Sequence, residues 1–249
     1  MASLLLRRCY CSRSASFVRS SKIAPLLWKS SSEEDDQNVT VQLLSWGRGA
    51  SGQLGGGIEE IRLYPTPVCS LLLPPSFRLS SPISGRLCDA DPVGAVEVGI
   101  SCGLFHSSLL VDGKLWIWGK GDGGRLGFGH ENSVFEPTVN PNFDCGLKSV
   151  ALGGVHSVAL TSAGQVFTWG YGGFGALGHS VYHRELFPRL VEGPWDGTIR
   201  HVATSGTHTA AINESGILFP VHYFGFKYKD FLTFTEEPSM EIHCQDMLN

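Results

Sequence analysis

The sequence predicts an all-β fold built from repeated units. A ten-residue block that opens with Trp-Gly occurs three times, at residues 46–55, 118–127 and 169–178. In each block, glycines stand three, six and nine places after the tryptophan, and a leucine stands eight places after it. Blocks that recur at intervals of tens of residues are typical of solenoids and propellers. The 31 glycines among 249 residues and the hydrophobic share of 42% favour a turn-rich, packed protein over a disordered one.

The first 32 residues differ in composition from the rest of the chain. They contain six basic residues, nine serines and no acidic residue, and the first acid is Glu33. This composition is typical of an organellar transit peptide. We expect residues 1–35 to be a disordered mitochondrial transit peptide; a plastid address and a plain basic tail are the alternatives. Without the first 32 residues, the chain keeps 13 of its 19 basic residues and all 23 acidic ones, which is a net charge of −10 instead of −4.

The strands expected in the repeats follow one order. A short apolar run precedes a second run that begins with histidine, then a turn with glycine, then an alternating strand that ends at Trp-Gly. In the first unit only the strand at residues 39–46 is legible. The order recurs at residues 96–101, 106–111 and 114–118, at 150–152, 156–160 and 165–169, and at 199–203, 208–212 and 217–219.

The chain departs from this order in two places. Trp46 and Trp118 are 72 residues apart, whereas Trp118 and Trp169 are 51 apart, so we expect an insertion near residues 70–90 that forms a surface loop. The repeat next requires Trp-Gly at positions 221 and 222, where the chain has Val221 and His222. We expect residues 221–249 to be a loosely ordered, non-repeat tail, and the mid-strand change suggests a truncated isoform of a longer protein.

The motif G-x-x-H-[S/T], followed by a glycine turn, Trp-Gly and G-x-x-G-x-L-G, resembles the regulator-of-chromosome-condensation repeat. The match covers residue 43 to about residue 219. The family fold is a seven-bladed β-propeller, so the resemblance implies that residues 36–220 form a partial propeller, an open arc of about three blades. With the targeting segment, the chain is similar to plant mitochondrial members of the group related to the UV-B receptor and guanine-exchange factors. The positions that carry the resemblance are Trp46, Gly47, Gly55, His106, Gly113, Trp118, Gly119, Gly127, His156, Gly164, Trp169, Gly170, Gly178, His208 and Gly216.

The glycine blocks also fit the dinucleotide pattern G-x-G-x-x-G, for example at Gly119, Gly121 and Gly124. That pattern binds pyrophosphate only when a helix follows it, and no helical period follows any of the three blocks. One enzyme needs one such loop, whereas three in register indicate structural turns. We therefore expect no cofactor.

The three histidines His106, His156 and His208 occupy equivalent places in successive units. Rotation about the propeller axis would separate them, so we expect structural histidines bonded to neighbouring backbone and no metal site. The repeat tryptophans are expected to fill the core between adjacent sheets.

Catalysis and light sensing find no support in the sequence. We find no set of nucleophile, base and orienting residue, and we expect a protein that is not an enzyme. In the UV-B receptor a light-absorbing tryptophan follows the glycine of the histidine motif, and here those positions hold Leu104, Gly154 and Gly206.

Two functions remain open. The first is a mitochondrial interaction scaffold that supports organellar RNA processing, including splicing, through protein partners. The alternative is guanine-nucleotide exchange on a small GTPase. A net charge of −10 argues against direct binding of nucleic acid by this chain. The seven cysteines show no metal-binding spacing, and no apolar run is long enough to span a bilayer.

Overall fold

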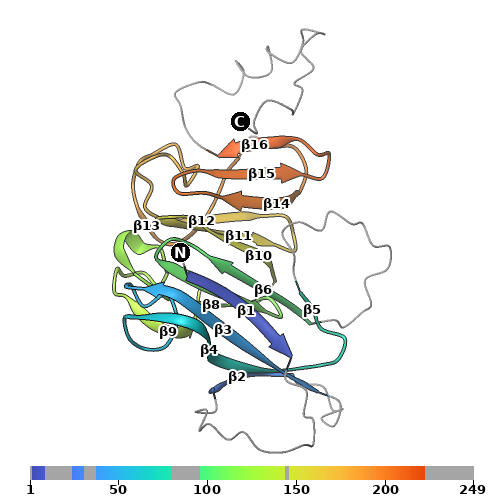
Figure 1. Cartoon of the computed structure of the whole chain (residues 1–249). Helices are drawn as coiled ribbons and strands as arrows, with labels where there is room; N and C mark the ends of the chain where they lie inside the picture. Colours follow the sequence, from blue (N-terminus) through green and yellow to red (C-terminus); the bar gives the residue numbers. More distant parts are fainter. Residues whose placement is uncertain are drawn as a thin grey trace, which may run out of the picture.

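The computed structural model describes residues 2–8, 24–30, 38–79, 96–143, 146–193 and 195–221, and strands dominate it. Four sheets follow one another in chain order, from the blue to the red end of the ribbon in Figure 1. We call them blades 1 to 4. Blade 1 contains β1 (Ala2–Arg8), β2 (Leu26–Lys29), β3 (Val39–Gly49) and β4 (Glu60–Leu73). Blade 2 contains β5 (Arg78–Leu79), β6 (Glu97–Cys102), β7 (His106–Val111), β8 (Lys114–Gly119) and β9 (Val134–Val139). Blade 3 contains β10 (Leu147–Leu152), β11 (His156–Thr161), β12 (Val166–Gly170) and β13 (Glu185–Leu190), and blade 4 contains β14 (Ile199–Thr204), β15 (Thr209–Asn213) and β16 (Leu218–Val221).

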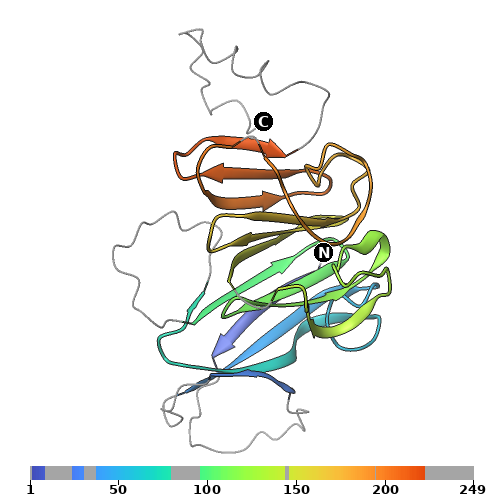
Figure 2. The same ribbon diagram turned by 180° about the vertical axis from the view of Figure 1, so that it is seen from behind.

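The sheets form an open partial β-propeller, as the sequence predicted. Blades 1 and 4 lie at opposite ends of the stack in both views (Figure 2). In blades 2 to 4 the consecutive long strands pair antiparallel, each with the next along the chain. The described residues contain no helix long and apolar enough to cross a membrane.

The turn between β7 and β8 shows why the repeat needs its glycine. Val111 pairs with Lys114, and the two residues between them, Asp112 and Gly113, have φ angles of 52° and 73°. Two positive φ angles in a two-residue hairpin suit the right-handed twist of the flanking strands. Aspartate tolerates this region better than most residues, and glycine adopts it without a steric penalty.

The core lies between blades and not within one. Three hydrophobic clusters fill the contacts of blades 1 and 2, blades 2 and 3, and blades 3 and 4. Trp118 belongs to the first cluster and Trp169 to the second, and both are fully buried. Each sheet therefore depends on its neighbour for stability, because a single sheet has no second layer to cover its apolar face.

The outer strands β9 and β13 were not among the strands expected from the sequence. Each contains a proline, Pro137 in β9 and Pro188 in β13. Proline has no N–H to donate to a ladder and is confined mainly to edge strands. Both strands lie at the edge of their sheets, so the prolines are compatible with the fold.

The structure differs from the expected disorder at the amino terminus. The strand β1 pairs antiparallel with β3, from Ala2 opposite Gly47 to Arg8 opposite Val41, and β2 pairs parallel with β4. Leu4 packs against the first core cluster. Pairing satisfies backbone groups that the edge of β3 would otherwise expose. Residues 9–23 and 31–37 lie outside the described residues, and the targeting role stays a prediction.

The extra length expected near residues 70–90 lies mostly after β4. Residues 70–73 belong to β4, where Leu71 and Leu73 are fully buried in the first core cluster. The extra length therefore falls between Leu73 and the start of β6 at Glu97. The short β5 pairs with β6 within this stretch, and residues 80–95 lie outside the described part of the chain. The expected tail also lies outside it, except for Val221 at the end of β16.

Candidate functional site

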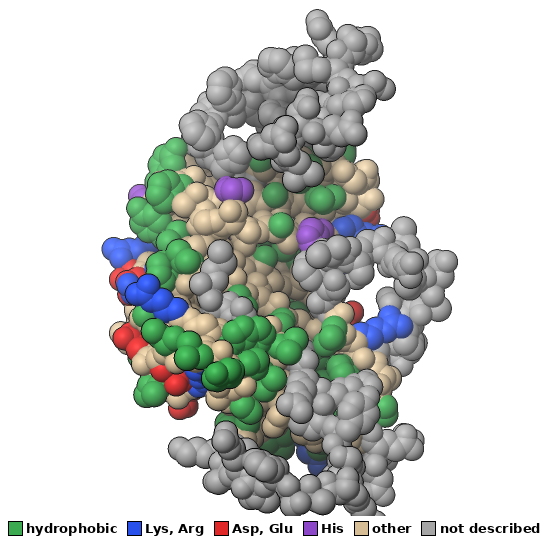
Figure 3. Space-filling model, in the orientation of Figure 1, with side chains coloured by type: hydrophobic (Ala, Val, Ile, Leu, Met, Phe, Trp, Pro, Cys, Tyr) green, Lys and Arg blue, Asp and Glu red, His purple; other side chains and the backbone are tan. Residues whose placement is uncertain are grey.

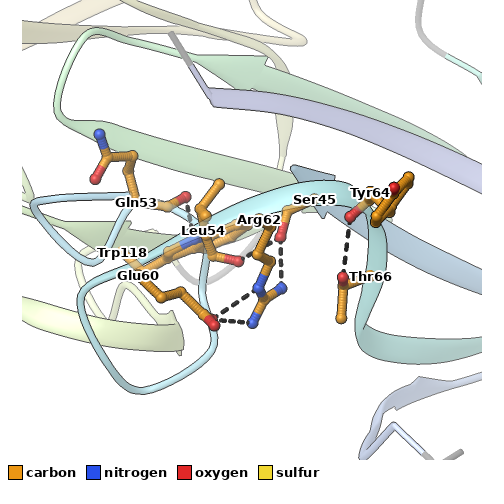
Figure 4. A network of polar contacts seen from close by, with 8 residues as sticks. All are labelled: Ser45, Gln53, Leu54, Glu60, Arg62, Tyr64, Thr66 and Trp118. Carbon is orange, nitrogen blue, oxygen red and sulfur yellow. Dashed lines mark hydrogen bonds and ion pairs between the residues drawn. The ribbon is translucent and has the colours of Figure 1, made fainter. Parts of the chain in front are cut away.

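The glycine block of each blade binds side chains of the next blade. At the contact of blades 1 and 2, the backbone carbonyl of Gln53 accepts two hydrogen bonds, from Ser107 Oγ at 2.8 Å and from Trp118 Nε1 at 3.0 Å. Figure 4 shows Trp118 reaching the loop of blade 1 from β8. The neighbouring carbonyl of Leu54 accepts a bond from Ser45 of its own blade at 2.7 Å. We call the set of bonds between two blades a joint.

The joint of blades 2 and 3 repeats this geometry and adds a histidine. The carbonyl of Arg125 accepts hydrogen bonds from Ser157 Oγ at 2.7 Å and from Trp169 Nε1 at 3.0 Å. The ring of His106, on β7, contacts the same hydroxyl through Nε2 at 2.8 Å. A three-member relay thus crosses from blade 2 to blade 3 and back.

The joint of blades 3 and 4 keeps the relay. His156 Nε2 lies 2.8 Å from Thr209 Oγ1, which donates to the carbonyl of Ala176 at 3.0 Å. The tryptophan position of this unit holds Val221, so the indole bond of the other two joints is missing here.

The relay fixes the tautomer of the histidines. A serine or threonine hydroxyl has one proton, and that proton is donated to the loop carbonyl, so the ring must donate through Nε2. Nδ1 of His106 and of His156 is then an unprotonated acceptor, buried and without a hydrogen-bond partner. A second ring proton would place an N–H group in the same apolar setting with no acceptor.

Both relay histidines are therefore neutral at physiological pH. Burial, followed by the charges of Arg125 and His156, lowers the pKa of His106 from 6.5 to about 3. Burial, followed by the charge of His208, lowers the pKa of His156 from 6.5 to about 4. Burial disfavours the charged imidazolium, which is why both pKa values fall.

The three histidines do not share one environment. His106 and His156 are fully buried, whereas His208 is exposed and precedes β15. Trp46 is likewise only half-buried, while Trp118 and Trp169 are fully buried. The joint of blades 2 and 3 buries the histidine of the earlier blade and the tryptophan of the later one. No described blade follows His208 or precedes Trp46.

His106 and His156 contact hydroxyls of the next blade, which the sequence did not predict, and a backbone hydrogen bond with His156 is among the influences on the pKa of His106. No group of three His, Cys, Asp or Glu residues within the described ranges is arranged to hold a metal ion. The residues missed from the sequence are the hydroxyl partners Ser107, Ser157 and Thr209. Their signal is present in the repeat motif, because each of them directly follows a repeat histidine.

The repeat glycines are structural turns. All nine glycines assigned to the repeat have positive φ angles: Gly47, Gly55, Gly113, Gly119, Gly127, Gly164, Gly170, Gly178 and Gly216. At Gly127 a Cβ atom would lie 2.8 Å from Trp169 Nε1, so a side chain there would displace the indole from the joint. The second block contains only a three-residue 3₁₀ turn (Asp122–Gly124) before β9. That geometry lacks the helix a dinucleotide site needs.

The outer ends of the glycine blocks lie together at one edge of the propeller. Basic and acidic side chains alternate along this rim, at the left of Figure 3, with hydrophobic side chains above them. The ion pairs there join Lys120 to Asp122 at 2.7 Å and, between blades 2 and 3, Arg184 to Glu131. Another pair joins Arg189 to Glu185. We call this surface the loop edge.

The regulator of chromosome condensation (RCC1) repeat matches the chain at residues 112–160 and 163–212, and a second RCC1 repeat model matches residues 147–176. The chain carries RCC1 repeats. It is 64% identical over 198 residues to RCC1 domain-containing protein RUG3, mitochondrial, from Arabidopsis thaliana, which covers 78% of this chain and 44% of that protein.

Two solved structures share the fold. Human WBSCR16 is 25% identical with a TM-score of 0.52, over 75% of this chain and 45% of that one. Prp20p of Saccharomyces cerevisiae is 22% identical with a TM-score of 0.50, over 81% and 45%. The chain thus spans less than half the length of each of these three proteins.

Proposed function

We propose that this chain is a mitochondrial, non-enzymatic interaction platform that supports organellar RNA processing, including splicing, through protein partners. The observation that carries the proposal is the 64% identity with RUG3, whose name places that protein in mitochondria. The fold is compatible with a platform, because His106, His156, Trp118 and Trp169 are engaged in the joints while the loop edge is exposed.

The charge arrangement favours protein partners over RNA. The rim cations Lys120, Arg184 and Arg189 each pair with a carboxylate on the loop edge. Binding to a phosphate backbone depends on unpaired Lys and Arg that release counterions. The whole chain has a net charge of −4, which adds long-range repulsion of phosphates.

Guanine-nucleotide exchange remains the alternative. Prp20p has binding properties toward Gsp1p and histones, but 22% identity carries the fold alone. No residue described in this chain favours exchange specifically, so the platform proposal takes precedence.

Affinity purification from isolated mitochondria tests the proposal. The tagged chain should recover RNA-processing proteins that remain bound after RNase treatment. Ultraviolet crosslinking should give no RNA adduct on the chain itself. An unrelated mitochondrial protein with the same tag, purified in parallel, controls for nonspecific capture. Direct RNA adducts, or partners that all disappear with RNase, would overturn the proposal.

A further inference from the structure

The glycine block of blade 3 differs from the other two at its exposed positions. Two places after the repeat tryptophan the three blades carry Arg48, Lys120 and Tyr171, and five places after it they carry Ser51, Gly123 and Phe174. Thirteen places after it they carry Glu59, Glu131 and Tyr182. Blade 3 thus replaces polar residues or glycine with three aromatic side chains, and its backbone differs locally from that of blade 2, where Gly123 has a positive φ angle of 70°.

The glycine at position 173 makes room for the ring of Tyr171. A Cβ atom on Gly173 would lie 2.3 Å from the ring of Tyr171, so the ring lies directly on the glycine backbone. In blade 2 the same two positions hold Lys120 and Asp122, which form an ion pair instead. Blade 2 uses the pair of positions for a charge contact, and blade 3 uses them to place an aromatic ring.

The three aromatic side chains remain largely exposed. The exposed fractions are 43% for Tyr171, 58% for Phe174 and 57% for Tyr182. The rings of Tyr171 and Phe174 meet edge to face at 5.9 Å. A hollow of about 510 Å³ beside them is lined by Tyr171, Tyr182, His183 and Arg184. Its volume is that of an ordinary ligand pocket.

The hydrogen bonds of the joints use other residues, although a Cβ atom on Gly123 of blade 2 would lie 3.2 Å from Tyr171 Cβ. Large aromatic side chains gathered at the surface mark an interaction site, and tyrosine and arginine are among the residues that most often dominate binding. The backbone beneath is tightly packed, because a Cβ atom on Gly172 would lie 2.0 Å from the carbonyl oxygen of His183. This contact holds the two sides of the hollow in fixed positions.

The charges beside the hollow are compatible with a neutral ligand. Arg184 in its wall pairs with Glu131, so the pair adds no net charge to the hollow. Aromatic walls with a few polar groups suit a polyproline II segment, whose backbone carbonyls have no internal hydrogen-bond partners. Tyr171, His183 and Arg184 are side chains that can donate to such carbonyls.

We propose that the hollow of blade 3 binds a proline-rich segment of a partner protein in the extended polyproline II conformation. The inference rests on the proposed role of the chain as a protein-binding platform and identifies the chemistry of one partner. Tyr171 and Tyr182 line the hollow and supply the apolar surface for the proline rings, and Phe174 packs against Tyr171.

Titration of the purified full chain with fluorescein-labelled decaproline tests the inference by fluorescence anisotropy. A Gly-Ser decamer and a ten-nucleotide oligouridine serve as competing ligand classes. The key variant combines Tyr171→Lys, Gly173→Asp and Phe174→Gly, which gives blade 3 the residues that blade 2 carries at these positions. The matched control is Tyr64→Thr, which removes a tyrosine that is 77% exposed on blade 1.

We expect decaproline to bind the wild-type chain and the control with the same affinity. It should bind the triple variant at least about tenfold more weakly. The unfolding midpoint of the variant is measured in parallel, and the titration is run well below it, so that a loss of binding reports on the hollow and not on unfolding. Equal binding by the variant, preference for oligouridine, or no binding of decaproline would each overturn the inference. The purified-chain titration is independent of the mitochondrial purification, so the two proposals fail separately.

Discussion

The relay histidines should make the fold sensitive to mild acid. His106 and His156 have pKa values of about 3 and about 4 in the folded chain, below the ordinary value of 6.5. The unfolded chain therefore binds more protons than the folded chain between pH 6.5 and these values. Stability is complete above pH 6.5, falls as the pH drops through this window, and changes little from this source below pH 3.

The loss can be worked out for pH 5. At pH 5 the solution is 1.5 pH units below the pKa of 6.5 of a histidine in the unfolded chain, so that histidine is protonated. The buried histidines of the folded chain are still neutral at this pH. Each histidine then costs about 2 kcal/mol of unfolding free energy relative to pH 7.5, and the pair costs about 4 kcal/mol. That is a large part of the typical stability of a domain.

Urea denaturation at pH 5.0 and pH 7.5, followed by tryptophan fluorescence, measures the effect. The test variant is His106→Gln with His156→Gln, because the glutamine amide can still donate to the hydroxyls of Ser157 and Thr209 but does not titrate. The wild type should lose about 4 kcal/mol more than the double variant between the two pH values. An equal loss in both proteins would refute the argument that buried, neutral imidazoles hold the joints.

Three further predictions address the joints, the turns and the amino terminus. Ser157→Ala should lower the unfolding free energy by about 1–3 kcal/mol, and by more than Ser107→Ala, because only Ser157 serves a buried imidazole; a smaller loss than in the comparator would contradict the relay. Gly119→Ala should cost more than Gly146→Ala, since both have positive φ angles but only Gly119 has a backbone oxygen 2.5 Å from the new Cβ; calorimetry measures both, and saturable binding of NAD, ATP or GTP to the wild type would show that the glycine blocks are misinterpreted. Residues 1–32 fused to a fluorescent reporter should direct it to mitochondria, and a cytosolic or exclusively plastid reporter would exclude that address.

The inner strands of each blade were predictable because their pattern is local. The strands expected at residues 106–111 and 156–160 correspond to β7 and β11, since alternation and a glycine turn lie within a dozen residues. The outer strands β9 and β13 were not predictable in the same way. Pro137 and Pro188 argue against a strand in the sequence. Proline is acceptable in β9 and β13 only because these strands lie at the edge of their sheets.

The hydrogen bonds between blades could not be predicted from a local sequence pattern. The bond between His106 and Ser157 joins residues that are 51 positions apart, which is one repeat length. The repeat period therefore predicts that the two residues lie in successive blades, but it does not predict that their side chains touch. The strand β1 shows the opposite case. Composition alone marked its segment as targeting, while its partner β3 lies some forty residues later along the chain. Such a pairing follows from the free edge of β3 and not from the segment itself.

The joints give each repeat a direction, and this bears on how such a protein changes over generations. At the joint of blades 2 and 3, the earlier unit contributes a carbonyl and an imidazole, and the later unit contributes a hydroxyl and an indole. A stretch of gene duplicated in tandem therefore encodes a copy that fits its parent on either side. Mutations of exposed side chains such as those at positions 171 and 174 leave the hydrogen bonds of the joints unchanged. Duplicated repeats can therefore acquire different binding preferences while the blades stay packed together.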